Sequence, residues 1–203
     1  MDLYFSPLAC SLATRISLYE AGADARFLSV NLKTKTLADG GDFLAVNPKG
    51  QVPVVRFEDG AVLTENAAIL TYVSSAYPKV GATGVNALRL AEWLSFISAE
   101  LHRGVFGTLL SAKANDGAKA FAREEAIARL AHLDAHLQDR DFLVGETFTV
   151  ADAYLTTILN WNQIAQIDLA PWPHLVAYHR RMLSRPAVLR AVGEERELYA
   201  RAA

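Results

Sequence analysis

The sequence contains a single cysteine, Cys10, and its position favours reactive chemistry. Leu3, Tyr4 and Phe5 predict a strand that ends at Pro7, and Leu12, Ile16 and Tyr19 predict a helix that stops at Gly22. Cys10 therefore falls in or just before the first helical turn. Unpaired backbone N–H groups there stabilise negative charge, so we expect the pKa of this thiol to be lowered in favour of the thiolate. The alternative is an inert, buried cysteine.

A second candidate site is Glu65-Asn66, at the start of a helix that Thr64 is expected to cap and that runs to about Ala76. Free N–H groups at this helix start could take a ligand carboxylate, while Glu65 takes a ligand ammonium group. The alternative is a glutamate that only favours the helix dipole, typically by about 0.3–1 kcal/mol.

Val52-Pro53 opens a predicted strand and could also serve a ligand. A cis bond would redirect the chain and leave the backbone N–H and C=O of Val52 free to face a ligand. Cis bonds make up only about 5–6% of X–Pro bonds in folded proteins, so the residues alone favour a trans proline at the first position of a strand.

His102 is the best histidine candidate for chemistry. On a continuous α-helix it shares a face with Ser95, Ala99 and Phe106, and Arg103 is adjacent. A lone helical histidine is more often packed or solvated than catalytic, and that alternative stays open.

His132 and His136 have the one-turn spacing of a metal pair, but no metal site is predicted. Leu133 stands where a metalloprotease would need glutamate, and the sequence offers no evident third ligand. We interpret the two histidines as part of a solvated face. The sequence also lacks the glycine-rich motifs of nucleotide binding.

The composition limits the classes of partner. A net charge of −2 over 203 residues gives no electrostatic case for nucleic acid or an anionic membrane. Hydrophobic residues make up 52% and charged residues 21%, which argues against disorder. One cysteine fits a reducing compartment, and we find neither a leader pattern nor an apolar run of membrane-spanning length. We expect a soluble, cytoplasmic protein.

The elements that must position these residues divide the chain in two. Residues 1–77 mix strands and helices in the order βαβ, loop, ββα, with a strand at Arg26–Val30, a turn at 47–50 and a hairpin at Asp59-Gly60. Residues 78–86 are predicted as the linker, and 87–203 as a helical domain. Its helices are indicated by the apolar stripes Leu90, Leu94, Ile97, Leu101 and Ile127, Leu130, Leu133, Leu137, by a capping box at Thr149–Asp152, and by Pro173 and Pro186 at two helix starts.

Four segments together resemble the beta-class glutathione S-transferases of bacteria, end to end. They are Tyr4–Leu12, Val46–Pro53, Leu63–Ile69 and Phe148–Tyr154. The resemblance implies a thioredoxin-like N-terminal domain, with a mixed sheet, followed by an all-helical C-terminal domain. It also implies a homodimer, a cis Val52-Pro53 bond and glutathione as co-substrate.

The resemblance further implies roles for individual residues. Cys10 would lie beside the glutathione sulfur and form a mixed disulfide with it, and His102 would reach in from the helical domain. Glutathione would be held by Lys35, Val52, Pro53, Glu65, Asn66, Ser95, Ala99 and Arg103. Apart from the resemblance, we expect the helical domain to bind an apolar substrate in a cleft beside Phe106 and Trp161. Asn66 replaces a smaller residue and Arg103 replaces a common lysine, which affects contact details.

These expectations lead to one main function and one alternative. The main function is an enzyme that conjugates glutathione to small hydrophobic electrophiles, with glutathione-dependent thiol–disulfide exchange through Cys10. A helix N-terminus lowers a thiol pKa by only about one unit, so His102 or the Ser11 N–H is expected to supply further stabilisation. The alternative is a non-catalytic carrier of glutathione and apolar ligands.

Overall fold

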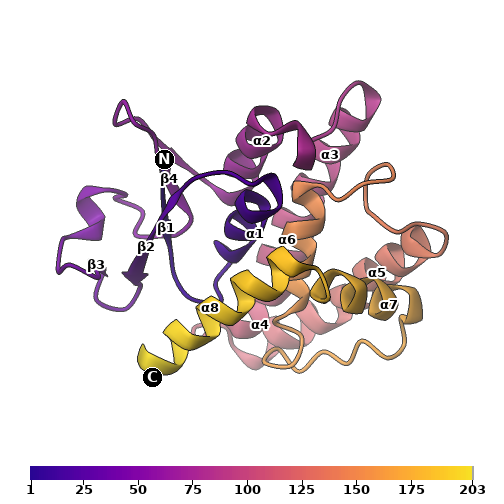
Figure 1. Ribbon diagram of the computed structural model, residues 1–203. Coiled ribbons are helices and arrows are strands. Elements are labelled where there is room, and N and C mark those ends of the chain that lie inside the picture. The colour runs from indigo at the N-terminus through magenta and orange to yellow at the C-terminus, as the bar shows by residue number, and fades with distance from the viewer. Residues whose placement is uncertain (203) are drawn as a thin grey trace.

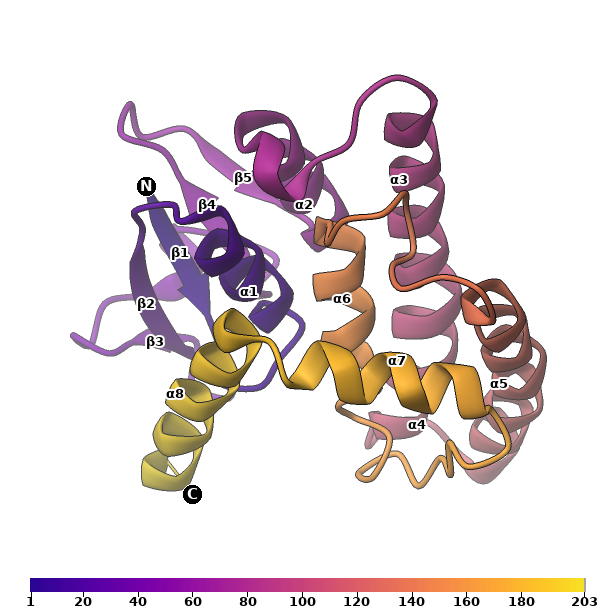
Figure 2. The same ribbon diagram turned by 45° about the vertical axis from the view of Figure 1, so that its right-hand side comes forward.

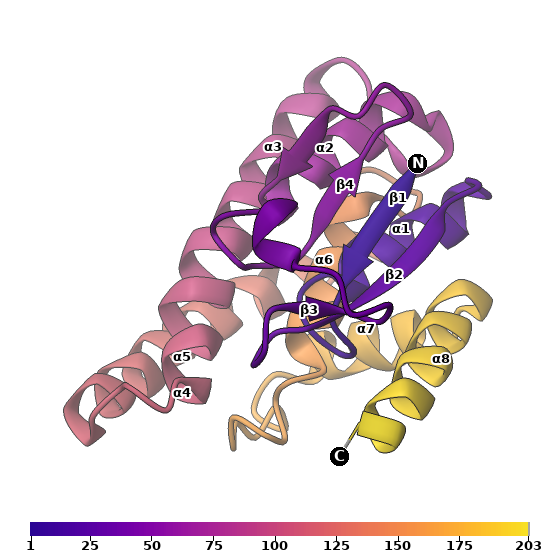
Figure 3. The same cartoon turned by 90° about the vertical axis from the view of Figure 1, so that its left-hand side faces the viewer.

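The computed structural model describes residues 1–202 and has a five-stranded sheet beside a group of helices (Figure 1). The strands lie in the order β3-β2-β1-β4-β5. β1 pairs in parallel with β2, and the other neighbouring pairs are antiparallel, so the sheet is mixed. The strand bounds are β1 Asp2–Phe5, β2 Arg26–Asn31, β3 Thr36–Leu37, β4 Val54–Arg56 and β5 Val62–Thr64. Figure 3 shows β2, β1 and β4 side by side, with β1 central.

The predicted fold class is confirmed, and the short elements follow local sequence rules. Helix α1, Leu12–Ala21, ends at Gly22, whose φ of 73° is a left-handed value that glycine adopts without strain. The β4–β5 hairpin turns at Asp59-Gly60, where Gly60 also has a positive φ of 86°. The Val52-Pro53 bond is cis, as the resemblance implied and against the base rate.

Beyond the sheet the chain is helical. The remaining elements are the short turns η1 Phe43–Ala45 and η2 Pro78–Val80, and the helices α2 Asn66–Ala76, α3 Val85–Phe96, η3 Ile97–Gly107, α4 Thr108–Leu110, α5 Asp116–Leu137, α6 Val150–Leu159, α7 Pro173–Leu183 and α8 Pro186–Ala202. Pro173 and Pro186 each open a helix, as predicted. Within the segment predicted as a linker, the structure has η2 and the first two residues of α3.

Helix α6 is the centre of the packing between the two parts. It contacts α1, α2, α3 and η3, and in Figure 2 it lies between α1 and α3. All ten of its residues are buried. The predicted capping box is present, because the Asp152 carboxylate accepts the Thr149 backbone N–H at 2.8 Å. Helix α8 packs against α1, so the last helix of the chain returns to the N-terminal part of the fold (Figure 2).

Several local predictions were wrong. The short strand β3 was missed, because two residues carry too little pattern to detect. Thr64 is the last residue of β5 and Glu65 is the N-cap of α2, since the hairpin pairing with Val54 extends to Thr64. Ile127 is 61% exposed, and Ala126 fills the place expected for it in the buried stripe of α5. Within residues 1–202, no helix is long and apolar enough to cross a bilayer.

Candidate functional site

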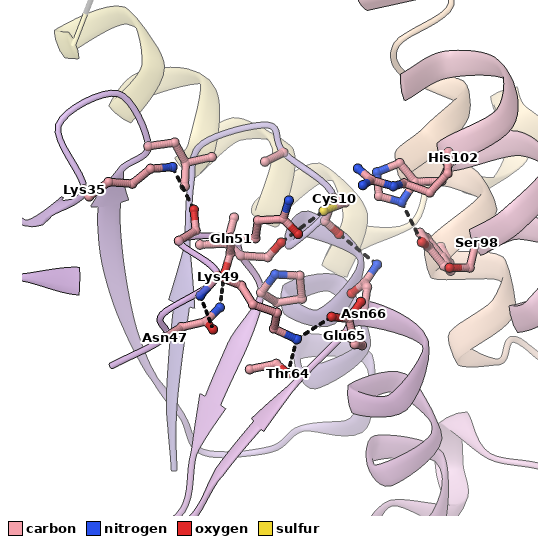
Figure 4. Close-up of a pocket in the computed structure, with 17 residues that line it drawn as sticks. Cys10, Lys35, Asn47, Lys49, Gln51, Thr64, Glu65, Asn66, Ser98 and His102 are labelled. Carbon is pink, nitrogen blue, oxygen red and sulfur yellow. Dashed lines mark hydrogen bonds and ion pairs between the residues drawn. The ribbon is translucent and has the colours of Figure 1, made fainter. Parts of the chain in front are cut away.

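A cleft of about 300 Å³ lies where the N-terminal sheet meets the helices, and Figure 4 shows its lining. Four groups of residues form it: the start of α1, the turn between β2 and β3, the loops around β4 and β5, and residues of η3 and α6. The lining residues are Ala9, Cys10, Leu32, Lys35, Asn47, Lys49, Gly50, Gln51, Val52, Pro53, Thr64, Glu65, Asn66, Ser98, His102, Arg103 and Tyr154. The structure therefore brings together most of the residues that the sequence singled out.

Cys10 lies just before α1, and its thiol donates a hydrogen bond to the Val52 carbonyl oxygen at 3.3 Å. Burial raises the pKa of Cys10 to about 12, and this outweighs the backbone N–H groups of Cys10 and Ser11 and the charge of Arg103, which lower it. The expectation of a thiolate is thus wrong for the unliganded protein. The helix start does favour the anion, but desolvation costs more.

The loop before β4 brings backbone groups and cations to the other end of the cleft. The cis Val52-Pro53 bond turns the chain so that Val52 lies against Cys10. Lys35 is held across the loop by donating to the Gly50 carbonyl oxygen at 2.8 Å, and the side-chain amide of Asn47 donates to Gln51 O at 2.8 Å. Figure 4 shows Lys35 far from His102, at the opposite side of the cleft.

Glu65 is the N-cap of α2 and has a φ of 71°, an uncommon value for a residue with a side chain. Its carboxylate pairs with the ammonium group of Lys49, which also donates to Thr64 Oγ1 at 2.7 Å. The side chains of Lys49 and Glu65 are 48% and 68% exposed. An ion pair this exposed contributes little to stability, so a ligand ammonium group can displace Lys49 at small cost.

Asn66 uses its side chain within the fold. Its carbonyl oxygen accepts from Thr14 Oγ1 at 3.0 Å, and its amide donates to the Cys10 carbonyl oxygen at 3.2 Å. These two bonds tie the start of α2 to the start of α1, where Cys10 lies. The Asn66 side chain thus positions the loop around the cysteine.

His102 is one of the three residues that η3 contributes to the cleft lining. Its Nδ1 lies 2.8 Å from the Tyr154 hydroxyl oxygen, and its ring packs edge-on against Trp161 at 5.3 Å between centroids. Burial, with a smaller contribution from Arg103, lowers the pKa of His102 to about 4. His102 is therefore neutral near pH 7 and cannot supply the cation expected beside Cys10. Arg103, which is exposed, is the cationic side chain that η3 adds to the lining of the cleft.

The winding of η3 separates the residues that an α-helix would align. Over Ile97–Gly107 the helix is a π-helix, whose wider turns change the direction of successive side chains. Ser98 lines the cleft with His102, whereas Ser95 and Ala99 are exposed and lie outside its lining. Phe106 is fully buried in the core behind Trp161, with ring centroids 6.4 Å apart, and does not line the cleft either.

Several cleft residues were not singled out as site residues from the sequence, among them Lys49, Tyr154 and Ser98. Lys49 and Tyr154 stand inside segments that carried the resemblance, so their position there was the available signal. Ser98 stands four residues before His102, and this i,i+4 spacing, which puts two side chains on one face of a helix, was the available signal.

The histidine pair on α5 has a structural role. His132 stacks on the Trp93 ring, with centroids 5.6 Å apart, and His136 packs on the same ring at 4.6 Å. The His136 ring also bonds to the Leu143 carbonyl oxygen through Nε2 at 3.0 Å. We expected a solvated face, but both rings pack on Trp93. Within residues 1–202, no group of three or more His, Cys, Asp or Glu side chains is placed to hold a metal.

Comparisons with known proteins agree with this architecture. The chain matches the family models for the glutathione S-transferase N-terminal domain over residues 2–75 and C-terminal domain over residues 91–186. It is 37% identical to glutathione S-transferase GstA of Escherichia coli O157:H7, over 96% of this chain and 98% of that protein.

Solved structures extend the comparison to three dimensions. A sphingomonad glutathione S-transferase complexed with glutathione superimposes with a TM-score of 0.91 at 41% identity, and a bacterial beta-class glutathione S-transferase of Sphingomonas chungbukensis with 0.90 at 38%. Each covers 96% of this chain and 98% of its own. With the thioredoxin-like domain, the helical domain and the cysteine cleft between them, this chain belongs to the beta class of the glutathione S-transferase family.

Proposed function

We propose that this glutathione S-transferase conjugates glutathione to small hydrophobic electrophiles and also reduces mixed disulfides by thiol–disulfide exchange through Cys10. The observation that carries the proposal is the position of the Cys10 thiol, 3.3 Å from the Val52 carbonyl oxygen inside the cleft. A ligand thiol seated against Val52 would lie beside this sulfur. Glutathione in the solved structure of the sphingomonad relative supports the choice of ligand.

Glutathione has charged groups at both ends, and the cleft offers complementary groups. We assign its γ-glutamyl end to Glu65 and the backbone start of α2 at Asn66, where a carboxylate and free helical N–H groups lie together. Its glycyl carboxylate is assigned to the side of Lys35. Val52 and Pro53 then face its cysteinyl part.

The groups around Cys10 suit the ionisation of a ligand thiol. The backbone N–H groups of Cys10 and Ser11 and the charge of Arg103 all favour an anionic sulfur there. They fail to ionise Cys10 because it is desolvated. A ligand sulfur in the open part of the cleft keeps more of its solvation, so its anion is disfavoured less. The enzyme then contributes to conjugation by ionising glutathione and orienting it towards the electrophile.

The exchange reaction uses the Cys10 sulfur directly. Cys10 thiolate attacks the glutathionyl sulfur of a mixed disulfide, forming a Cys10–glutathione disulfide and releasing the other half as a thiolate, which takes up a proton. A second glutathione thiolate attacks the glutathionyl sulfur of that intermediate, releases oxidised glutathione and restores Cys10. The net reaction oxidises glutathione and reduces the substrate disulfide.

The Cys10→Ala variant separates the two activities. We expect disulfide reduction to fall at least 100-fold, while conjugation to an aryl halide falls less than about tenfold. Asp139→Ala, an exposed change just after α5, is the control and is expected to alter neither rate. Unchanged disulfide reduction in Cys10→Ala would contradict the role of Cys10. Retention of the wild-type protein on immobilised glutathione without turnover of either substrate would favour the carrier alternative.

The assembly and the electrophile site belong to the same proposal. Trp161 is assigned to the electrophile side of the cleft, since its ring flanks His102, and Phe106 supports it from the core. A cytoplasmic homodimer is proposed, and Val85 and Leu88 on α3, which are 68% and 72% exposed, are apolar surface available for such an interface. A sedimentation mass equal to one chain would contradict the dimer.

A further inference from the structure

The Tyr154 hydroxyl lies at the floor of the cleft, and its position constrains where the proton of His102 resides. Tyr154 comes from α6 and is fully buried, yet it is part of the cleft lining. Its oxygen is 2.8 Å from His102 Nδ1, so one of the two groups donates to the other. Either tautomer of neutral histidine satisfies this distance, and the neighbours of Tyr154 decide between them.

Among residues 1–202, His102 Nδ1 is the hydrogen-bond partner that the structure gives the Tyr154 hydroxyl. The two polar groups of the Asn66 side chain are already paired with Thr14 and with the Cys10 carbonyl oxygen. If His102 donated to the Tyr154 oxygen, the buried Tyr154 proton would be left without an acceptor, which costs the desolvation free energy of that group. The Tyr154 hydroxyl therefore donates to His102.

The ionisation states are consistent with this direction of donation. Tyr154 keeps its proton throughout the physiological range, because burial disfavours the phenolate. His102 is neutral there, because burial also disfavours the imidazolium. A neutral imidazole whose Nδ1 accepts a hydrogen bond carries its proton on Nε2.

We propose that Tyr154 is a positioning residue that holds His102 in the Nε2–H tautomer, so that the ring offers the cleft a hydrogen-bond donor and not a base. The ring cannot rotate freely to exchange roles, since Tyr154 and Trp161 pack against it with centroids 5.9 and 5.3 Å away. The Nε2–H group then stabilises a sulfur anion without transferring its proton. This consequence, but not the tautomer itself, rests on the proposed function.

Long-range ¹H–¹⁵N correlation spectra of the ¹⁵N-labelled, unliganded protein at pH 7.5 test the tautomer directly. Signals of His102 are assigned by their loss in His102→Asn. We expect a protonated Nε2 and an unprotonated Nδ1 in the wild type, and a mixture of tautomers in Tyr154→Phe, which keeps the ring and loses the hydroxyl. A wild-type spectrum with the proton on Nδ1 overturns the proposal, whatever the activity of the enzyme.

Steady-state kinetics with glutathione and an aryl halide supply the second measurement. Tyr154→Phe is expected to lower kcat about tenfold while the KM for glutathione changes less than about twofold, because the sulfur loses its oriented donor. Tyr178→Phe is the matched control: it removes a hydroxyl that is equally buried but bonds to Asp152. We expect this control to leave the His102 tautomer and kcat unchanged.

The outcomes separate this proposal from the proposed function. An unchanged kcat and tautomer in Tyr154→Phe, with an active wild type, overturns the positioning role and leaves conjugation intact. A wild type without transferase activity overturns the proposed function, while the wild-type spectrum still supports or overturns the tautomer.

Discussion

The Glu195 carboxylate accepts the Leu8 backbone N–H at 2.7 Å, although the two residues are 187 positions apart. Helix α8 thereby holds the loop two residues before Cys10. The Leu8 carbonyl oxygen accepts from Trp161 Nε1 at 2.9 Å, so the helical domain bonds to both polar backbone groups of Leu8. Leu8 has a φ of 60°, and a leucine in this strained conformation must be held by its surroundings.

Glu195 makes stability depend on pH. Burial raises the pKa of Glu195 to about 7 from the ordinary value of 4.5, although the Leu8 N–H and the charge of Arg15, 3.6 Å away, act against it. Between these values the folded state binds a proton that the unfolded state releases, so this group's contribution to stability decreases as pH rises. Between pH 4.5 and pH 8, we expect the free energy of unfolding of the wild type to fall by about 1–3 kcal/mol relative to that of Glu195→Gln.

Urea unfolding of both proteins across this range measures the difference. Glutamine keeps an oxygen that can accept from Leu8 and removes only the titrating group. The comparison also cancels the opposite pH dependence of His102 and His179, whose pKa values burial lowers to about 4. The prediction would be contradicted if the free energies of unfolding of the two proteins differed by the same amount at every pH.

Cys10 should react slowly in the unliganded protein. With its pKa raised to about 12 by burial, the thiolate is rare at pH 7. We expect alkylation by iodoacetamide to be at least about tenfold slower than for free glutathione at pH 7.5, and to keep rising up to pH 10. Because Cys10 is the single cysteine of the chain, incorporation of label reports on this site alone. The urea-unfolded chain is the control, and a plateau below pH 9 in the folded protein would argue against the raised pKa.

Gly107 should not tolerate a side chain. A Cβ atom at this position would lie 2.7 Å from the His102 carbonyl oxygen, and a backbone atom cannot move away as a side chain can. Gly107→Ala must therefore disturb the π-helix that presents His102 to the cleft. We expect the free energy of unfolding, measured by thermal unfolding, to fall by about 1–3 kcal/mol, and kcat to be reduced.

Gly193→Ala on α8 is the matched control. A Cβ there meets no heavy atom within 4 Å, so the substitution is expected to stabilise the helix by about 0.5–1 kcal/mol. If both alanine variants had the same melting temperature as wild type, the close approach at Gly107 would have no energetic consequence.

Asp152 should be among the residues that matter most for folding. Its buried carboxylate accepts from the Leu143 N–H, from the N–H and hydroxyl of Thr149, and from the Tyr178 hydroxyl, at 2.8–2.9 Å. Asp152→Ala leaves these donors without a partner, so we expect a loss of about 3–5 kcal/mol in urea unfolding. Asp139→Ala, an exposed aspartate, should stay within about 0.5 kcal/mol of wild type.

Glu65 should contribute to glutathione affinity more than its partner Lys49 does. Glu65→Gln removes the charge assigned to the ligand ammonium group, and we expect calorimetry to show about tenfold weaker binding. Lys49→Met removes only an exposed ion pair, so affinity should change less than about threefold. A larger loss in Lys49→Met than in Glu65→Gln would reverse the assignment.

The sequence by itself determined the elements whose signals are local. Gly22 ends α1, Asp59-Gly60 forms the hairpin, and Asp152 caps α6, because each depends on residues a few positions apart. The resemblance supplied the cis bond at Val52-Pro53, which no local rule favoured.

Tertiary structure alone decided the properties that depend on burial and on distant partners. Cys10 and His102 are neutral because the two domains together desolvate them, which outweighs the local helix start. Ser98 lines the cleft with His102, whereas Ser95 and Ala99 do not. Periodicity groups residues on a face of a helix, but it does not say what that face packs against, and an α-helical period does not hold within the π-helix Ile97–Gly107. The Leu8–Glu195 contact was equally hidden, because sequence patterns carry no information about which carboxylate, 187 residues away, a free N–H will meet.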